Sequence, residues 1–331
     1  MAHFSGRDLI YVLMLCSAVW FLIMFVQLES CRGGINDHQP SSLVTYRKAL
    51  AAKEKEIKYL REHADSLNRR QHVVGLPTIY IITPTYTRPV QKAELTRLST
   101  VFHSISNVHW IVVEDSDVKS NLVVDFLKDC ELNTTHLLSV TPPDVKLREK
   151  DPNWLKPRGV LQRNTGLAWL RSNLNADFNH GVVYFADDDN TYSVKLFAEM
   201  RDTKKVSVWP VGLVGKLRYE SPLIEAGKVI GWHTYWFRNE RPFAMDMAGF
   251  AVNLHVILEN SLAKFDINAK RGFQESVFLQ ALGITLEDLE PKASMCTKVL
   301  VWHTRTEPAN LSNEEKMEMK GYKKSDSHVE V

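Results

Sequence analysis

From residue 76 onwards the chain alternates between short apolar runs and longer amphipathic stretches. The short runs are rich in β-branched and aromatic residues, and they predict strands at Thr78–Thr83, Trp110–Val113 and Thr135–Val140. Helices are predicted at residues 93–104, 122–127 and 162–171. A fourth run, Gly181–Ala186, is apolar throughout, which is typical of a strand buried on both faces. This alternation predicts an α/β fold with a mostly parallel sheet between two layers of helices.

Three adjacent aspartates, Asp187, Asp188 and Asp189, follow the last of these strands. Ligands of such sheets bind beyond the carboxyl ends of the strands, where this triplet stands. A cation most simply relieves the repulsion among its carboxylates, and all-oxygen ligation suits Mg²⁺ or Mn²⁺. A solvated acidic turn is the alternative, but the position after a buried strand favours a metal site. Because side chains alternate along an extended chain, Asp187 and Asp189 are expected on one side and Asp188 on the other.

Three arginines accompany the triplet and indicate a substrate that carries phosphate. Arg158 and Arg163 flank a predicted helix start, and Arg305 follows Trp302 and His303. Each arginine alone is more typical of an ordinary surface residue, so the inference depends on their combination with the aspartates.

Several other classes of protein are excluded by what the sequence lacks. The 41 basic and 39 acidic residues nearly balance, which excludes a nucleic-acid binder that relies on counterion release. Gly212–Lys216 resembles half of a P-loop, but Pro210 and Leu217 break the motif. No G-x-G-x-x-G follows the first strand, and HExxH and G-x-S-x-G are absent.

The amino-terminal part predicts a membrane anchor. Leu9–Val26 carries no charge and approaches the roughly 20 residues that a spanning helix needs. A cleaved signal peptide is the alternative, but this run is longer than its usual apolar stretch and no clear cleavage site follows. The glycosylation acceptors Asn133 and Asn310 both lie after the run, so their use would place the main body in the lumen.

A helical stem is predicted between this anchor and the α/β body. Ser41–Arg70 places Leu50 and Ile57 at one heptad position and Tyr46 at the other, which favours pairing of two chains over a single solvated helix. Cys31, just beyond the anchor, is a candidate for a bond between two chains. The predicted order is a cytoplasmic tail (1–8), a signal anchor (9–26), a stem (27–75) and a lumenal catalytic domain (76–331).

This organisation resembles a Golgi glycosyltransferase with the GT-A type of fold. More narrowly, the chain is similar to the β1,3-glucuronyltransferases of glycosyltransferase family 43 over about residues 77–307. The similarity is carried by the blocks ITPTY (82–86), PRGV (157–160), QRN (162–164), VYFADDDNTY (183–192), MAGFAV (247–252) and VWHTRT (301–306).

The resemblance implies an inverting, Mn²⁺-dependent transfer of glucuronate from UDP-glucuronate to the 3-hydroxyl of a terminal β-galactose. It also implies a single-pass type II protein of the Golgi membrane, a homodimer, with no nucleic-acid partner. The implied donor contacts are Pro84, Tyr86, Asp115, Arg158, Arg163, Asp187, Asp188, His303 and Arg305, with Asp189 as the main metal ligand. The implied acceptor contacts are Glu220, Trp236, Arg241 and Asp246.

The resemblance further assigns the catalytic base to Glu275. An inverting displacement needs a base opposite the leaving group, to take the proton of the attacking hydroxyl. By itself, Glu275 is more typical of a first-turn carboxylate that stabilises a helix of residues 275–282.

Three alternatives stay open at this level. A non-catalytic relative that binds glycans would be expected to lack the base or the triplet, and a nucleotide-sugar hydrolase would use the same site. The acceptor is either the Gal-Gal-Xyl linker of proteoglycans or a Gal-GlcNAc end. By resemblance, residues 211–215 favour the linker, whereas residues 231–232 and 251–254 favour Gal-GlcNAc. The linker is the preferred acceptor of the two.

Overall fold

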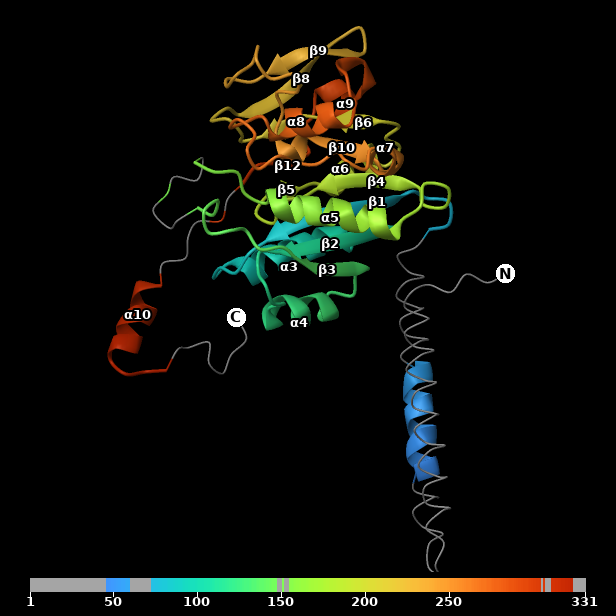
Figure 1. Cartoon of the computed structure of the whole chain (residues 1–331), viewed down its shortest axis with the longest axis vertical. Coiled ribbons are helices and arrows are strands. Elements are labelled where there is room, and N and C mark those ends of the chain that lie inside the picture. Colours follow the sequence, from blue (N-terminus) through green and yellow to red (C-terminus); the bar gives the residue numbers. More distant parts are fainter. Residues whose placement is uncertain are drawn as a thin grey trace, which may run out of the picture. The chain divides into compact units, whose positions relative to one another are not determined.

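The computed structural model describes residues 46–59, 73–147, 151, 155–304, 306 and 311–323 (Figure 1). The chain divides into two compact units, residues 1–63 and 64–331. In the first unit, residues 46–59 are helical and exposed, including the predicted seam residues Tyr46, Leu50 and Ile57.

The predicted anchor, residues 9–26, lies outside the described residues, as does Cys31. None of the helices in the described ranges is long and apolar enough to cross a membrane. The proposed boundaries of tail, anchor, stem and catalytic domain therefore stay predictions.

A seven-stranded mixed sheet forms the centre of the second unit, in the order β11-β6-β10-β4-β1-β2-β3. Its strands are β1 (Thr78–Thr85), β2 (Val108–Glu114), β3 (Thr134–Leu138), β4 (Gly181–Phe185), β6 (Val206–Val208), β10 (Phe250–Asn253) and β11 (Leu289–Pro291). Strands β4, β1, β2 and β3 run parallel, and β11 is parallel to β6, whereas β10 is antiparallel to both of its neighbours. The prediction of a mostly parallel α/β sheet is confirmed.

Helices cover both faces of this sheet. The side chains of β4 are apolar on both faces, and each face is therefore buried under helices. Val183 and Phe185 pack in one core cluster, whereas Val182 and Tyr184 pack in the other. The first cluster includes residues of α5 (Val160–Asn173), α7 (Leu254–Glu259) and α8 (Gln274–Ala281). The second includes residues of α3 (Gln91–Phe102), α4 (Asn121–Asp129) and α6 (Val194–Met200). Figure 1 shows α5 lying along the sheet.

The predicted helices and strands recur with shifted ends. The main difference is at β3, which ends at Leu138 instead of Val140. There the carbonyl oxygen of Ser139 accepts a hydrogen bond from Nε2 of Gln162 on α5 (2.7 Å), so this part of the chain is held by a helix side chain.

A smaller five-stranded sheet has the order β5-β12-β7-β8-β9. Its strands are β5 (Thr191–Tyr192), β7 (Val211–Gly212), β8 (Tyr219–Glu225), β9 (Lys228–His233) and β12 (Val301–Trp302). The remaining elements are η1 (Met247–Gly249), η2 (Leu286–Asp288), the left-handed turn α9 (Ala293–Cys296) and the exposed α10 (Ser312–Met319). The aspartate triplet lies between β4 of the large sheet and β5 of the small sheet, so it belongs to the connection between the two sheets.

Candidate active site

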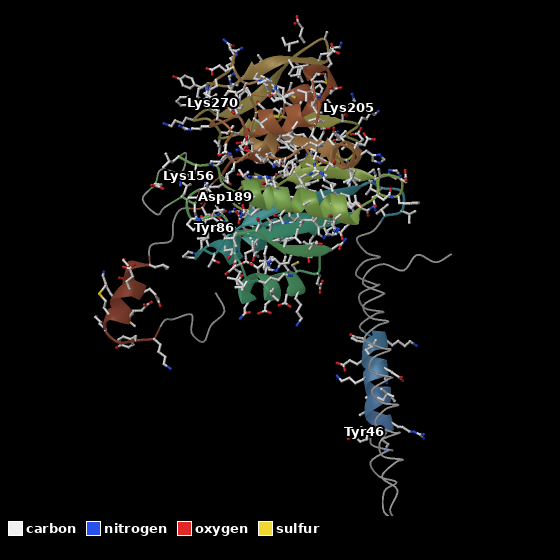
Figure 2. All side chains as sticks on the ribbon, viewed as in Figure 1. Tyr46, Tyr86, Lys156, Asp189, Lys205 and Lys270 are labelled. Carbon is white, nitrogen blue, oxygen red and sulfur yellow. The ribbon has the colours of Figure 1, made fainter. Side chains whose placement is uncertain are left out.

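Acidic and aromatic residues follow the parallel strands β1, β2 and β4 at their carboxyl ends. Thr85, the last residue of β1, is in register with Glu114, the last residue of β2. Tyr86 comes after β1, and the aspartate triplet comes after β4. Figure 2 shows Tyr86 and Asp189 on the same side of the body. The predicted position of the triplet at this edge is confirmed.

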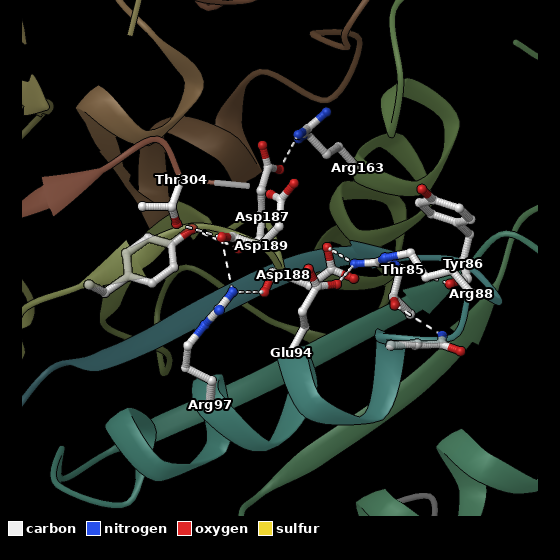
Figure 3. Close-up of polar contacts among 12 residues, drawn as sticks. Thr85, Tyr86, Arg88, Glu94, Arg97, Arg163, Asp187, Asp188, Asp189 and Thr304 are labelled. Atoms are coloured by element: carbon white, nitrogen blue, oxygen red, sulfur yellow. Dashed lines mark hydrogen bonds and ion pairs between the residues drawn. The ribbon is translucent and has the colours of Figure 1, made fainter. Parts of the chain in front are cut away.

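The side chains of Asp187 and Asp188 contact different arginines, and Asp189 is contacted through its backbone carbonyl oxygen (Figure 3). The Oδ1 atom of Asp187 accepts a hydrogen bond from Nη2 of Arg163 on α5. On the other side, Asp188 is buried, and its Oδ1 lies 2.7 Å from Nη2 of Arg88, while its Oδ2 has no partner. The turn is held by Arg97, which donates to the carbonyl oxygen of Asp189 (2.9 Å).

Burial raises the pKa of two of these carboxyl groups. The pKa of Asp188 reaches about 6 because burial outweighs the opposing charge of Arg88. The pKa of Asp189 is also raised, by burial first and then by the negative charge of Asp187. A divalent cation at Asp189 would oppose both burial and the charge of Asp187, and would lower the pKa of this carboxyl group.

The oxygen atoms here fit Mg²⁺ or Mn²⁺. Among the described residues, no three His, Cys, Asp or Glu side chains converge as metal ligands. Such ions commonly bind through one or two carboxylates and complete their shell with water and substrate phosphate. Asp189, with Asp187 beside it, supplies this kind of partial site.

The start of α5 brings Arg163 to the triplet. Gly159, the residue before the helix, has φ +70°, and a Cβ there would lie 2.8 Å from Nη1 of Arg163 and 3.0 Å from Cγ of Pro84. Glycine therefore lets β1 and α5 approach closely. The Nη1 of Arg163 donates to the carbonyl oxygen of Arg158, whose own side chain is exposed. The Nε of Arg163 is buried without a partner, as a ligand-binding group can be before its ligand arrives.

A second group of donor candidates lies beyond β1 and β2. The ring of Tyr86 is part-exposed, and the guanidinium carbon of Arg88 lies 4.5 Å from its centroid. The Oδ1 of Asp115 accepts from the backbone N–H of Thr141 (2.7 Å), and its Oδ2 lies 3.6 Å from Nζ of Lys146. These contacts fix an aromatic surface and a carboxylate next to the triplet.

The other half of the site is a cavity of about 220 Å³. It is lined by the predicted base and all four predicted acceptor residues, Glu275, Glu220, Trp236, Arg241 and Asp246, together with Val214, Gly215, Phe237, Met245, Arg271 and Gly272. Residues that are up to 61 positions apart in the chain, from Val214 to Glu275, therefore line one cavity. We expect it to admit a sugar ring.

Glu275 lies in the first turn of α8 and lines this cavity. Burial, and after it the negative charge of Asp246, raises its pKa to about 7. A carboxyl group with that pKa exchanges a proton near neutral pH, as a general base should.

Asp246 connects Glu275 to His303. The Oδ2 of Asp246 lies 3.1 Å from Nδ1 of His303, and its Oδ1 accepts from the backbone N–H of Ala248 (3.0 Å). This hydrogen bond and the charge of Asp246 raise the pKa of His303 to about 9. Burial alone would raise the pKa of Asp246, but His303 outweighs it and holds that pKa below its usual value. The pair is therefore an imidazolium beside a carboxylate at neutral pH.

Glu220, another residue of the cavity lining, is held by its neighbours. Thr234 donates to its Oε1, and Nη2 of Arg241 lies 3.2 Å from the same threonine hydroxyl. Gly215 has φ +61°, and a Cβ there would lie 2.4 Å from the Glu220 Oε1. Burial raises the pKa of Glu220, and its hydrogen bond from Thr234 opposes that rise.

Few of the predicted site residues lie outside the donor residues around the triplet and the residues that line the cavity. Arg305 and Asn310 lie outside the described residues. Asn133 is exposed just before β3, at the amino end of that strand, so its use as an acceptor stays a prediction.

Sequence reasoning gave no role to several residues that hold the site together. They are Arg88, Glu94, Arg97, Thr234 and Thr304. The one signal in the sequence was the charge of Arg88 within the loop after the first strand. Arg97 and Thr304 contact the triplet from more than 90 positions away in the chain, which no local pattern encodes.

The family model and the curated relatives agree on one family. A family model described as glycosyltransferase family 43 matches residues 98–307. The chain is 60% identical over 243 residues to the Mus musculus protein named galactosylgalactosylxylosylprotein 3-beta-glucuronosyltransferase 2, covering 73% of this chain and 72% of that protein. It is 55% identical over 261 residues to the Homo sapiens protein named galactosylgalactosylxylosylprotein 3-beta-glucuronosyltransferase 1, with coverages of 77% and 75%. A crystal structure of S. aureus TarS 1-349 aligns with a TM-score of 0.42 and 14% identity, covering 69% of this chain and 60% of that chain.

Proposed function

The chain belongs to glycosyltransferase family 43, and from this membership we propose that it transfers glucuronate from UDP-glucuronate to galactose. The acceptor is the 3-hydroxyl of the terminal β-galactose of the Gal-Gal-Xyl linker on proteoglycans, in keeping with the names of its relatives. The catalytic body takes the GT-A type of fold, which accords with its mixed sheet and the acidic triplet after β4.

One observation carries the proposal for the reaction: Glu275 and the four acceptor candidates line a single cavity, and Asp246 links that cavity to His303. The proposed base thus shares its cavity with the acceptor candidates, whereas Arg163 lies on the side of the triplet, where it donates to Asp187. An inverting displacement requires this division, because the nucleophile enters opposite the leaving group.

The donor half binds UDP-glucuronate through its three chemically distinct parts. Tyr86 and Asp115, together with Pro84 of β1, supply the aromatic surface and the hydrogen-bond acceptor that suit a uracil base. Asp188 offers its unpartnered Oδ2 to a ribose hydroxyl. The diphosphate and the glucuronate carboxylate are anionic, and they take charge-assisted hydrogen bonds from Arg158, Arg163, His303 and Arg305.

The transfer step is a single displacement. The Glu275 carboxylate accepts the proton of the galactose 3-hydroxyl as its oxygen bonds to the anomeric carbon. The bond from that carbon to the β-phosphate oxygen breaks, and UDP leaves with the electron pair. The cations around the diphosphate, including the imidazolium of His303, stabilise the negative charge that develops there. Asp246 keeps His303 protonated and oriented during this step.

Asp189 would hold Mn²⁺, with Asp187 beside it. When bound, the metal neutralises charge on the diphosphate as the leaving group departs. Asp187 keeps its hydrogen bond from Arg163, so the triplet and α5 stay joined on the phosphate side.

The proposed setting is the Golgi lumen, with the protein as a type II homodimer. Its support is the uncharged run 9–26, the two glycosylation acceptors after it, and the heptad pattern of the stem.

The decisive assay incubates the full-length chain in detergent with UDP-glucuronate, Mn²⁺ and two acceptors in parallel, Gal-Gal-Xyl and Gal-GlcNAc. We expect glucuronylated Gal-Gal-Xyl as the dominant product. Dominant transfer to Gal-GlcNAc would contradict the linker assignment and keep the enzyme class. Free glucuronate as the main product would identify a hydrolase, and no turnover with UDP bound would identify a non-catalytic relative.

A further inference from the structure

Arg88 lies in the loop after β1 and joins three residues of the nucleotide half of the site (Figure 3). Its Nη2 contacts Oε2 of Glu94 on α3 and Oδ1 of Asp188, the latter at 2.7 Å. Its Nη1 donates to the carbonyl oxygen of Tyr86 at 3.0 Å. The guanidinium carbon also lies 4.5 Å from the centroid of the Tyr86 ring.

This cluster is buried and carries more negative than positive charge. Only 2% of the Glu94 side chain, 9% of the Asp188 side chain and 12% of the Arg88 side chain are exposed. Both carboxylates contact the same nitrogen atom, so they lie close to each other with one cation between them. Breaking such a buried set by removing the cation leaves two like charges without compensation.

The planar guanidinium explains why arginine stands here. One group donates to two carboxylates and a carbonyl oxygen and covers an aromatic face at the same time. A lysine ammonium is a point charge, and it does not match these directions together.

We infer that Arg88 is a positioning residue that sets Tyr86 and Asp188 in their donor-binding arrangement before UDP-glucuronate arrives. This inference rests on the proposed function. Of the two carboxylate oxygens of Asp188, Arg88 takes Oδ1, which leaves Oδ2 buried without a partner and available to a ligand hydroxyl. The same side chain holds the Tyr86 ring from one face, so the base-binding and ribose-binding groups are fixed by one cation.

Arg88 acts through its neighbours, so its loss should change donor affinity more than turnover. The phosphate-side groups Arg158, Arg163 and His303 keep their contacts in its absence. Turnover at saturating UDP-glucuronate should therefore fall less than the affinity for UDP.

The test measures UDP binding by calorimetry, with Mn²⁺ present, for the full-length chain and its variants. Arg88→Met should weaken UDP binding at least about tenfold, and Arg88→Lys should weaken it several-fold. Glu94→Gln alone should change it less than about threefold, since the pair of Arg88 with Asp188 remains. The double variant Arg88→Met/Glu94→Gln should bind UDP several-fold more tightly than Arg88→Met, because the second substitution removes the repulsion.

Recovery of UDP affinity in the double variant would show that Arg88 acts through its charge, because a loss of packing alone would not be restored by Glu94→Gln. The matched control is Arg201→Met, which removes a part-buried arginine that donates to the carbonyl oxygens of Pro77 and Ser106. It should lower the melting temperature and leave UDP affinity within about twofold.

Wild-type UDP affinity in Arg88→Met would overturn the inference, as would a double variant that binds UDP no better than Arg88→Met. If Arg88→Met does not fold, Arg88→Lys decides, because wild-type affinity in that variant would mean that a point charge suffices. A wild-type chain that binds no UDP would instead contradict the proposed function itself.

Discussion

The Nδ1 atom of His303 lies 3.1 Å from the Oδ2 atom of Asp246, and this contact joins the two halves of the site. Asp246 raises the pKa of His303 to about 9, and after burial it is the main cause of the raised pKa of Glu275. One carboxylate therefore favours the protonated form of both the base and a leaving-group cation. The predictions below follow from this coupling and from the packing around it.

Glu275→Gln should lower turnover at least about 100-fold while UDP affinity stays near wild type. The amide keeps the shape of the side chain but cannot accept the hydroxyl proton. Initial rates at saturating substrate and calorimetry with UDP give the two quantities. Glu225→Gln, at the exposed end of β8, is the matched control and should be neutral. Near-normal turnover of Glu275→Gln would dismiss its role as base.

The pH profile should have an acidic limb near pH 7. Glu275 works as a carboxylate and its pKa is about 7, so activity should fall about tenfold for each pH unit below that value. Asp246→Asn removes a negative charge that raises this pKa, so the limb should move to lower pH. The measurement is kcat/KM for the donor from pH 5 to 9 in both proteins. A limb that stays in place would mean that Asp246 does not act on Glu275.

Asp189→Asn should weaken Mn²⁺ binding at least about tenfold, because it removes the proposed charged ligand. Electron paramagnetic resonance of free Mn²⁺ during a titration reports this without any turnover. Asp202→Asn, an exposed aspartate paired with Lys292, should leave Mn²⁺ binding unchanged. Full activity of the wild-type protein in excess chelator would count against the metal.

Gly215→Ala should raise the KM for the acceptor about tenfold or more and leave UDP affinity unchanged. The added Cβ would lie 2.4 Å from Oε1 of Glu220, so that carboxylate must move. Gly283→Ala is the matched control, because Gly283 also has a left-handed φ (+71°) but its Cβ would meet nothing within 4 Å. Both variants carry backbone strain, so an equal effect on acceptor KM would show that Glu220 is not the cause.

The strands and helices up to β4 follow from local patterns. Gly181–Phe185 is apolar after its opening glycine, which is typical of a strand with both faces covered, and the structure buries all five residues. The acidic residues after it were placed correctly, because parallel strands end at one edge of a sheet. Local spacing also predicted the start of α5 beside Arg163.

The sequence by itself therefore determined the order of strands and helices up to β4, the buried strand and the acidic edge, because hydrophobic period and chain direction are local properties. Only the tertiary structure decided which cation meets which carboxylate. His303 and Asp246 are 57 positions apart in the chain. Arg88, in the loop after β1, contacts Asp188, which follows the neighbouring strand β4. Such contacts exist only once packing has fixed the backbones, since a charged side chain carries no local signal that names its partner.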